Sequence, residues 1–243
     1  MADAIVAVSD GVADRLAQAT GLPRGSIRTV YNPVVGPELP TLAAEPVGHP
    51  WFRHGGPPVV LGAGRLVEQK DFPTLLRAFA LVRRARPARL VILGDGPAGA
   101  CEGLRAIAAA LGCAEDLDLP GFVANPFAYM ARAAAFALSS LHEGLPGVLI
   151  QALACGCPVV STDCPSGPRE ILDGGRYGRL VPVGDHEALA RAILACLDDP
   201  SGREERVARA AAFGLERAVD RYLELIVRPA KAVVPRPAGA QAA

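Results

Sequence analysis

The sequence carries no net charge, no long apolar run and no Cys-x-x-Cys motif, and each absence excludes a class of protein. Lys plus Arg and Asp plus Glu number 25 each, so no overall field draws the chain to nucleic acid or to an acidic membrane surface. No run reaches the roughly 18 apolar residues of a transmembrane helix, and the first residues lack the basic and apolar regions of a signal peptide. We therefore expect a cytoplasmic protein with no transmembrane segment and no nucleic-acid partner.

The six cysteines give no metal or disulfide pattern. Cys155 and Cys157 flank a glycine, but no His or Cys follows them at the spacing of metal ligands, so we expect reduced thiols and no metal. The chain also lacks the Gly-x-Ser-x-Gly turn of the α/β-hydrolases. Ser161, Ser166 and His186 therefore suggest no nucleophile.

What the sequence does have is a regular alternation of short β-branched runs and amphipathic segments. The predicted strands are residues 59–64, 89–94, 116–122, 134–140, 158–163 and 178–183, and residues 71–86 between the first two form a helix with one apolar stripe. This alternation is typical of a parallel sheet covered by helices on both faces. We predict an α/β fold with a Rossmann-like, doubly wound parallel sheet.

The ends of the chain depart from this pattern. Residues 1–57 hold a strand, a short helix and a second strand before a stretch rich in Pro and Gly. Because so few elements cannot fold alone, we expect a remnant of another domain followed by a linker. Residues 58–200 form the predicted Rossmann-like domain and 201–228 add further helices. Residues 229–243, rich in Ala and Pro, are predicted to be a disordered tail.

Ligands of open parallel sheets bind beyond the carboxyl ends of the strands, and the loop after the first predicted strand carries two cations there. Arg65 and Lys70 follow Gly64, where the backbone can approach a ligand closely. Two cations on one loop suit a diphosphate. The residues alone leave open the alternative of a solvated surface pair.

The second charged loop, from Leu141 to Gly147, follows an apolar strand and opens a helix. Pro146 suits the first turn of that helix, and its free amides can bind phosphate oxygens. Gln151 lies farther along, where it can reach a ribose, which leaves Glu143 for a sugar. The alternatives are a glutamate favoured by the helix dipole and an ordinary helix-forming glutamine. His142 has the chemistry of a general base, but we assign it no role.

A third loop offers a competing interpretation. Residues 94–99 match Gly-x-Gly-x-x-Gly after a strand, with Glu115 and Asp116 about 20 residues farther on, the pattern of a dinucleotide site. An NAD-binding oxidoreductase is thus an alternative. The NAD-binding interpretation would assign no function to the loop of Arg65 and Lys70 or to the Glu143 loop.

Several segments taken together resemble the donor domain of the retaining glycosyltransferase family 4. They are GRLVEQKDFPTLLRAFALV, VILGDGP, LPGFVANPFAYMARAAAFALSS and EGLPGVLIQALACGCPVVSTDCPSGPREIL, and the resemblance runs from about residue 4 to 226. It implies the nucleotide-sugar-binding half of a GT-B fold with most of the N-terminal domain missing. It also implies transfer of a sugar from a nucleotide-diphosphate sugar such as a UDP-sugar, with retention and without a metal or other cofactor.

The resemblance gives each matching position a role. Glu143 becomes the catalytic residue that faces the donor sugar, and Arg65 and Lys70 clamp the diphosphate. The family's second glutamate, which binds the ribose, is here Gln151, and losing a charge-assisted hydrogen bond weakens donor binding by about 1 kcal/mol. The full set of predicted donor-binding residues is Gly64, Arg65, Lys70, Phe122, Val123, Gly144, Leu145, Pro146 and Gln151, with backbone near Phe122 and Val123 meeting the base.

The resemblance also implies a missing partner. Relatives carry a full first domain that binds the acceptor, and AAFGLERAVDRYLELIV resembles the final helix that crosses back to it. Its apolar stripe of Val219, Tyr222, Leu223 and Ile226 predicts an N-terminal half or partner chain that covers it. The CPSGPREIL segment favours polysaccharide, lipopolysaccharide or lipid-linked glycan synthesis, with peripheral association at the inner face of the membrane. A non-catalytic nucleotide-sugar-binding fragment is the alternative.

Overall fold

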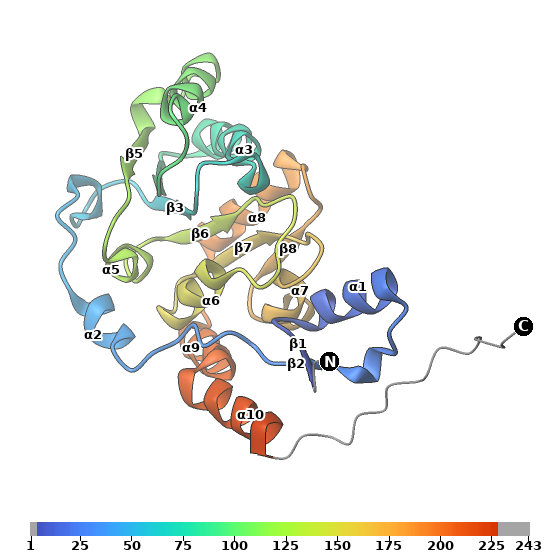
Figure 1. The fold of residues 1–243 in the computed structure, drawn as a ribbon. Coiled ribbons are helices and arrows are strands. Elements are labelled where there is room, and N and C mark those ends of the chain that lie inside the picture. The colour runs from blue at the N-terminus through green and yellow to red at the C-terminus, as the bar shows by residue number, and fades with distance from the viewer. Residues whose placement is uncertain (1–3, 228–243) are drawn as a thin grey trace, which may run out of the picture.

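A parallel sheet forms the centre of the structure, a computed structural model that describes residues 4–227. Its strands lie in the order β5-β4-β3-β6-β7-β8, and every neighbouring pair is parallel (Figure 1). Each observed strand lies within its predicted range, so the six strand predictions are confirmed. The strands are β3 (Val59–Ala63), β4 (Arg89–Leu93), β5 (Leu117–Gly121), β6 (Ala135–Leu138), β7 (Val159–Thr162) and β8 (Arg179–Val181).

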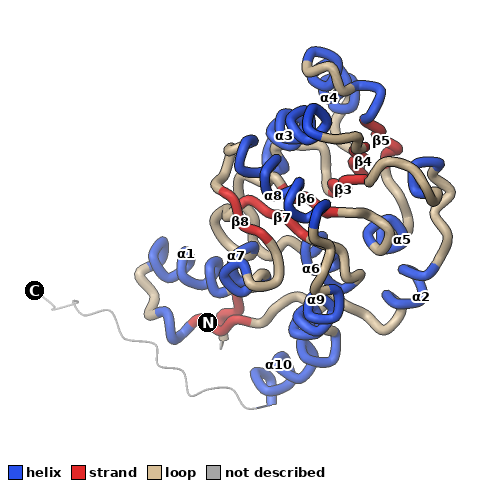
Figure 2. The backbone as a smooth tube through the Cα atoms, turned by 180° about the vertical axis from the view of Figure 1, so that it is seen from behind, coloured by secondary structure: helices blue, strands red, loops and turns tan. Residues whose placement is uncertain are grey.

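Helices cover both faces of this sheet, which confirms the doubly wound Rossmann-like fold (Figures 1 and 2). One face is covered by α3 (Phe72–Ala85), α4 (Ala100–Ala110) and α8 (His186–Asp198). The other face is covered by α5 (Pro126–Met130), α6 (Gly147–Ala154), α7 (Pro168–Ile171) and α9 (Arg203–Ala210), with α2 (Leu39–Ala44) packed outside α5.

Strand β3 shows why the sequence folds this way. Val60 packs under α3 and α8, whereas Val59 and Leu61 belong to the core on the opposite face. Because both faces are covered, the strand is apolar throughout rather than alternating. The helix that follows is capped by Asp71, whose side chain accepts a hydrogen bond from the Thr74 amide.

The N-terminal elements form a separate unit. Strands β1 (Ile5–Ala7) and β2 (Ile27–Thr29) pair in parallel beside α1 (Asp10–Thr20), and they do not join the main sheet. This arrangement fits the expectation of a remnant, although the predicted domain boundaries stay a prediction. The predicted tail, residues 229–243, lies outside the described residues.

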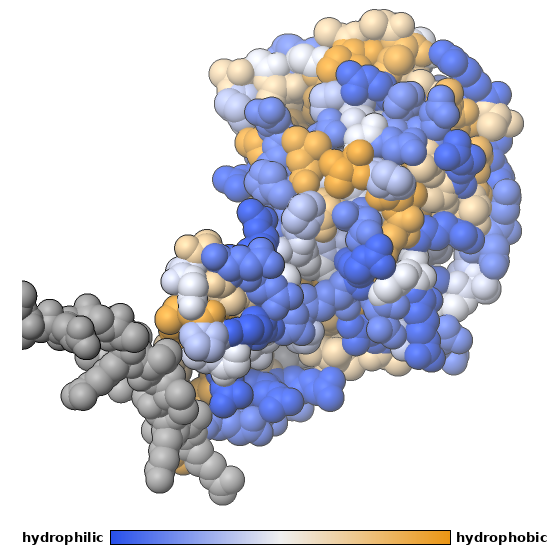
Figure 3. All heavy atoms as spheres, turned by 90° about the vertical axis from the view of Figure 1, so that its right-hand side faces the viewer, coloured by the Kyte–Doolittle hydropathy of each residue, from blue (hydrophilic) through white to orange (hydrophobic). Residues whose placement is uncertain are grey.

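The last described helix, α10 (Leu215–Val227), lies near the N-terminal strand pair (Figure 1), and its apolar stripe is exposed among residues 4–227. Val219, Tyr222, Leu223 and Ile226 are 39% to 72% exposed. Elsewhere, the side of the molecule seen in Figure 3 is largely hydrophilic, with separate hydrophobic patches. Among residues 4–227, no helix has both the length and the apolar character that a membrane span requires.

The cysteines are free thiols, and all except Cys101 are buried. Cys155 and Cys157 each donate a hydrogen bond to a backbone carbonyl, of Phe127 and Ala133 respectively. Burial raises the pKa of Cys155 to about 12 and that of Cys164 to about 11, so both thiols are neutral in the folded chain near neutral pH. In the described part of the chain, no three His, Cys, Asp or Glu side chains gather as a metal site requires.

The raised thiol pKa values predict a fold that loses stability in alkali. In the unfolded chain the thiols ionise above about pH 8.5, whereas in the folded chain they keep their protons. The free energy of unfolding therefore falls as pH rises, by at most about 1.4 kcal/mol per pH unit for each thiol. Urea unfolding under reducing conditions between about pH 8 and pH 10 measures this slope. It should be shallower in Cys155→Ala, and an unchanged slope would contradict the assignment.

Candidate functional site

The strand order places the candidate site at the centre of the sheet. From β3 the chain first moves outward through β4 to β5 and then returns to β6 on the other side of β3. The order thus reverses between β3 and β6, and ligands of doubly wound sheets bind at such a switch point. The loops that follow these two strands carry Arg65, Lys70 and Glu143.

An ion pair joins the two loops. Lys70 Nζ lies 2.6 Å from Glu143 Oε1, and the two side chains are only 13% and 8% exposed. The buried Ser140 hydroxyl donates to the same carboxylate oxygen at 2.7 Å. Gln69 Nε2 donates to the His142 carbonyl at 2.8 Å and lies 3.5 Å from Glu143 Oε2. The carboxylate therefore has partners of three kinds: an ammonium, a hydroxyl and an amide.

The backbone beneath this ion pair is fixed on both sides. The Leu141 amide donates to the Gln69 carbonyl at 2.8 Å, which fastens the β6 loop to the β3 loop. Ser139 Oγ donates to the Lys70 carbonyl at 2.7 Å, and Thr162 Oγ1 donates to the Ser140 carbonyl at 2.6 Å. Three neighbouring strands thus support the loops that hold the two charges.

Two glycines make room for the site. A Cβ on Gly64 would lie 3.1 Å from Lys70 Cε, so the glycine leaves space for the lysine side chain. Gly94 has a φ of 128°, and a Cβ there would lie 2.1 Å from the Gly64 carbonyl oxygen. Only glycine fits at this junction between the loops that follow β3 and β4.

The Gly-x-Gly-x-x-Gly match now has a structural explanation. Its loop follows β4, which lies beside the switch point rather than at it. Gly94 is required by the contact with Gly64, and Asp95 Oδ1 accepts a hydrogen bond from the Phe122 amide at 3.1 Å. The motif therefore joins neighbouring loops, and its position gives no support to the NAD-binding alternative.

The other predicted donor-binding residues lie on the loops that follow β3, β5 and β6, except Gln151, which lies in α6. Arg65 is exposed and Gln151 is half-buried in α6, and among the described residues neither side chain forms a hydrogen bond. Phe122 is 76% exposed on the β5 loop. Since its amide is bound to Asp95, its carbonyl and the partly buried Val123 backbone are what a base could meet.

The Glu143 loop is also attached to the N-terminal unit. Ser9 Oγ donates to the Gly144 carbonyl at 2.7 Å, and the Asp10 amide donates to the Glu170 carboxylate at 3.0 and 3.1 Å. Leu145 and Pro146 then turn the chain into α6, with Pro146 as its N-cap residue. Pro146 therefore immediately precedes the helix instead of occupying its first turn.

Sequence reasoning did not single out Gln69, Ser139 or Ser140. The only signal for the serines was two hydroxyls directly after the apolar strand β6, a position that a turn also explains. The Ser139 hydroxyl binds a carbonyl on the loop of a neighbouring strand, 69 residues away, whereas the Ser140 hydroxyl binds Glu143 three residues farther along its own loop.

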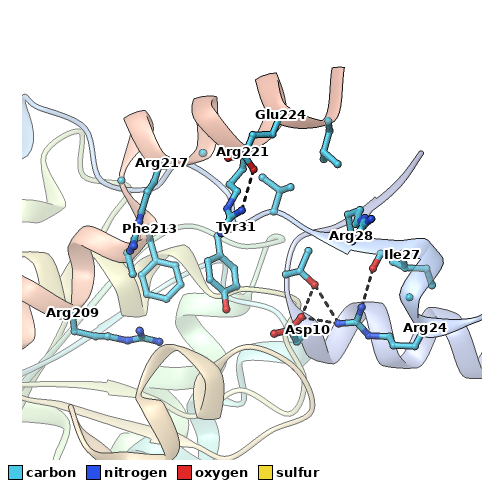
Figure 4. A pocket seen from close by; sticks show the side chains of 17 residues that line it. Asp10, Arg24, Ile27, Arg28, Tyr31, Arg209, Phe213, Arg217, Arg221 and Glu224 are labelled. Carbon is cyan, nitrogen blue, oxygen red and sulfur yellow. Dashed lines mark hydrogen bonds and ion pairs between the residues drawn. The ribbon is translucent and has the colours of Figure 1, made fainter. Parts of the chain in front are cut away.

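A cavity of about 750 Å³ lies elsewhere, between β2 and α10 (Figure 4). Tyr31 lies across it from α10, where Arg221 and Glu224 form an ion pair at 3.0 Å. Among the described residues, its lining includes none of the predicted donor-site residues. Its arginines are Arg24, Arg28, Arg209, Arg217 and Arg221.

Comparison with known families decides among the interpretations. Residues 57–199, more than half of the chain, match the model of the glycosyl transferases group 1. The chain belongs to the group 1 glycosyltransferases. The matched segment includes both loops of the ion pair, so the family's defining region and the switch point coincide.

Curated proteins similar to this group 1 glycosyltransferase are themselves named as glycosyltransferases. One is the N-acetylgalactosamine-N,N'-diacetylbacillosaminyl-diphospho-undecaprenol 4-alpha-N-acetylgalactosaminyltransferase of Campylobacter jejuni, 38% identical over 145 residues, which are 60% of this chain and 39% of the relative. Another is the lipopolysaccharide core biosynthesis glycosyltransferase LpsE of Rhizobium meliloti, 35% identical over 174 residues, which are 70% of this chain and 49% of the relative. The chain spans about half the length, or less, of the curated relatives it matches.

Solved structures share the fold. Anabaena HepE, solved with UDP and glucose, has a TM-score of 0.78 at 22% identity, over 93% of this chain and 64% of that chain. A glycosyltransferase from Rickettsia africae has the same TM-score and coverage at 18% identity. Both solved chains extend beyond the region that matches this chain, which agrees with this chain being one half of a GT-B fold.

The ion pair predicts a strong coupling between its two residues. Lys70→Met leaves a mostly buried carboxylate without its cation and should lower the free energy of unfolding by about 2 kcal/mol or more. Lys70→Met/Glu143→Leu should recover part of that loss, because no charge remains unpaired. Urea unfolding of the wild type, both single variants and the double variant measures the coupling.

The matched control is the surface pair of Arg86 and Asp198, whose side chains are 38% and 71% exposed. Arg86→Met should leave stability nearly unchanged. Strictly additive effects of the Lys70 and Glu143 substitutions would show that the pair is not formed in solution.

Proposed function

We propose that this chain is the donor half of a retaining glycosyltransferase of family 4, which transfers a sugar from a nucleotide-diphosphate sugar to an acceptor hydroxyl. The observation that carries the proposal is the meeting of Lys70 and Glu143 at the switch point, with Arg65 exposed on the loop that carries Lys70. Two cations and one carboxylate suit a ligand that combines a diphosphate with a sugar.

Each residue then has a chemical task. Arg65, Lys70 and the amides at the start of α6 bind the diphosphate and stabilise the charge that develops on it as the glycosidic bond breaks. Such electrostatic stabilisation makes a metal unnecessary. Glu143 faces the sugar, whose anomeric carbon gains positive character in an oxocarbenium-like transition state. Gln151 binds the ribose, and backbone near Phe122 and Val123 meets the base.

We propose UDP as the nucleotide and a glycan precursor as the acceptor. A structural neighbour was solved with UDP-glucose, and relatives are named for lipopolysaccharide core synthesis or for a diphospho-undecaprenol substrate. An acceptor of that kind would place the enzyme at the inner face of a membrane, as a peripheral protein.

The acceptor site would belong to an N-terminal half or a partner chain. The uncovered stripe on α10 and the share of each relative that this chain spans support that division. The same two observations also support the second candidate, a fragment that binds nucleotide sugars without transferring them.

Calorimetric titration with UDP, GDP and NAD tests the donor site. One nucleoside diphosphate should bind, and Lys70→Ala should weaken its binding about tenfold or more, a loss of about 1.4 kcal/mol, because a charge-assisted contact to the diphosphate is removed. Arg65→Ala should weaken it in the same direction.

Arg77→Ala, on α3 and exposed, is the control and should leave binding unchanged. Binding of NAD that is insensitive to Lys70→Ala would contradict the donor-site assignment. Retention at the anomeric carbon is checked separately, by NMR of the product formed once the acceptor half is supplied.

A further inference from the structure

Ser140 and Lys70 share one carboxylate oxygen, and this sharing has a functional consequence. Lys70 Nζ and Ser140 Oγ lie 2.6 and 2.7 Å from the same Glu143 Oε1. If Lys70 binds a donor diphosphate, its ammonium has to turn at least partly away from Glu143. The carboxylate would then be a mostly buried charge without its cation, an unfavourable state unless hydrogen bonds replace the lost contact.

The hydrogen bonds that hold Lys70 and Ser140 leave the lysine side chain able to move from Glu143 to a phosphate while the serine stays in place. The Lys70 backbone is held by Ser139 Oγ, which binds its carbonyl at 2.7 Å, so only the flexible side chain has to move. Ser140 is buried at the end of β6, and Thr162 Oγ1 holds its carbonyl at 2.6 Å. The serine hydroxyl therefore stays where it is when the lysine leaves.

From this geometry we infer that Ser140 is a positioning residue, which keeps the Glu143 carboxylate in place when Lys70 moves to the donor diphosphate. The inference rests on the proposed function and adds a residue to it. Without the hydroxyl, Oε1 depends on Lys70 alone, so the lysine is held more tightly by the carboxylate and is less available to phosphate.

A double-mutant cycle in nucleotide binding tests this role. The probe is UDP, or GDP if that is the diphosphate that the wild type binds. Ser140→Ala should raise its Kd about fivefold or more. In the Glu143→Gln background the same substitution should change Kd less than twofold, because no carboxylate is left to hold Lys70. A purely structural role for Ser140 would weaken binding equally in both backgrounds, and that outcome would overturn the inference.

Ser161→Ala is the matched control. Ser161 is also buried, on the neighbouring strand β7, and its hydroxyl donates to the Thr162 carbonyl rather than to the site. It should leave Kd unchanged. If it weakens binding as much as Ser140→Ala does, the loss reflects disturbed packing of the strands and the inference fails.

An unfolding cycle separates this inference from the proposed function, because it needs no ligand. Ser140→Ala should lower the folding equilibrium constant about tenfold more in the presence of Glu143 than in the Glu143→Gln background, since a hydroxyl bonded to a carboxylate stabilises more than one bonded to an amide. Additive effects would show that Ser140 does not hold the carboxylate. A wild-type chain that binds neither diphosphate would instead overturn the proposed function and the release of Lys70, whatever the unfolding cycle shows.

Discussion

The candidate site depends on one constraint: a lysine and a glutamate from loops far apart in the sequence have to meet in a place from which water is largely excluded. Such a pair is costly to bury unless further hydrogen bonds satisfy its remaining atoms. Here Ser140 and Gln69 surround the carboxylate, and β3, β6 and β7 hold the backbone on which the two charges stand. Gly64 packs closely against the Lys70 side chain, and Gly94 packs against Gly64 in turn.

Because the chain as a whole is neutral, the local placement of charges decides where an anionic ligand can bind. With equal numbers of acidic and basic residues, the protein has no general field that would attract a phosphate ligand. Attraction of the proposed diphosphate has to come from a few cations placed by the fold, and Arg65 and Lys70 lie on one loop at the switch point. The cavity near α10 also holds arginines, but it lies between β2 and the helix with the uncovered apolar stripe, so its basic lining is separate from the chemistry proposed for the sheet edge.

Much of the fold could be predicted from the sequence because its signals are local. Apolar runs such as residues 59–64 and the apolar stripe on α3 indicate which residues are buried. All six strands lie where the apolar runs predicted them. The strand order was not predicted, and it is the order that puts the glycine motif after β4 beside the switch point rather than at it. The positions of Lys70 and Glu143 could be singled out by residue type and by resemblance. Their contact comes from strand pairing over about seventy residues, which no local pattern records. Ser140 lies only three residues before Glu143, but a Ser-x-x-Glu spacing in a loop does not by itself indicate a hydrogen bond.

A crystal structure of this chain with the nucleoside diphosphate that it binds tests the proposed donor site most directly. We predict phosphate oxygens within hydrogen-bonding distance of Lys70 Nζ and a Glu143 carboxylate that still accepts from Ser140 Oγ. A diphosphate bound away from the loops after β3 and β6, with the Lys70–Glu143 contact unchanged from its 2.6 Å, would contradict it.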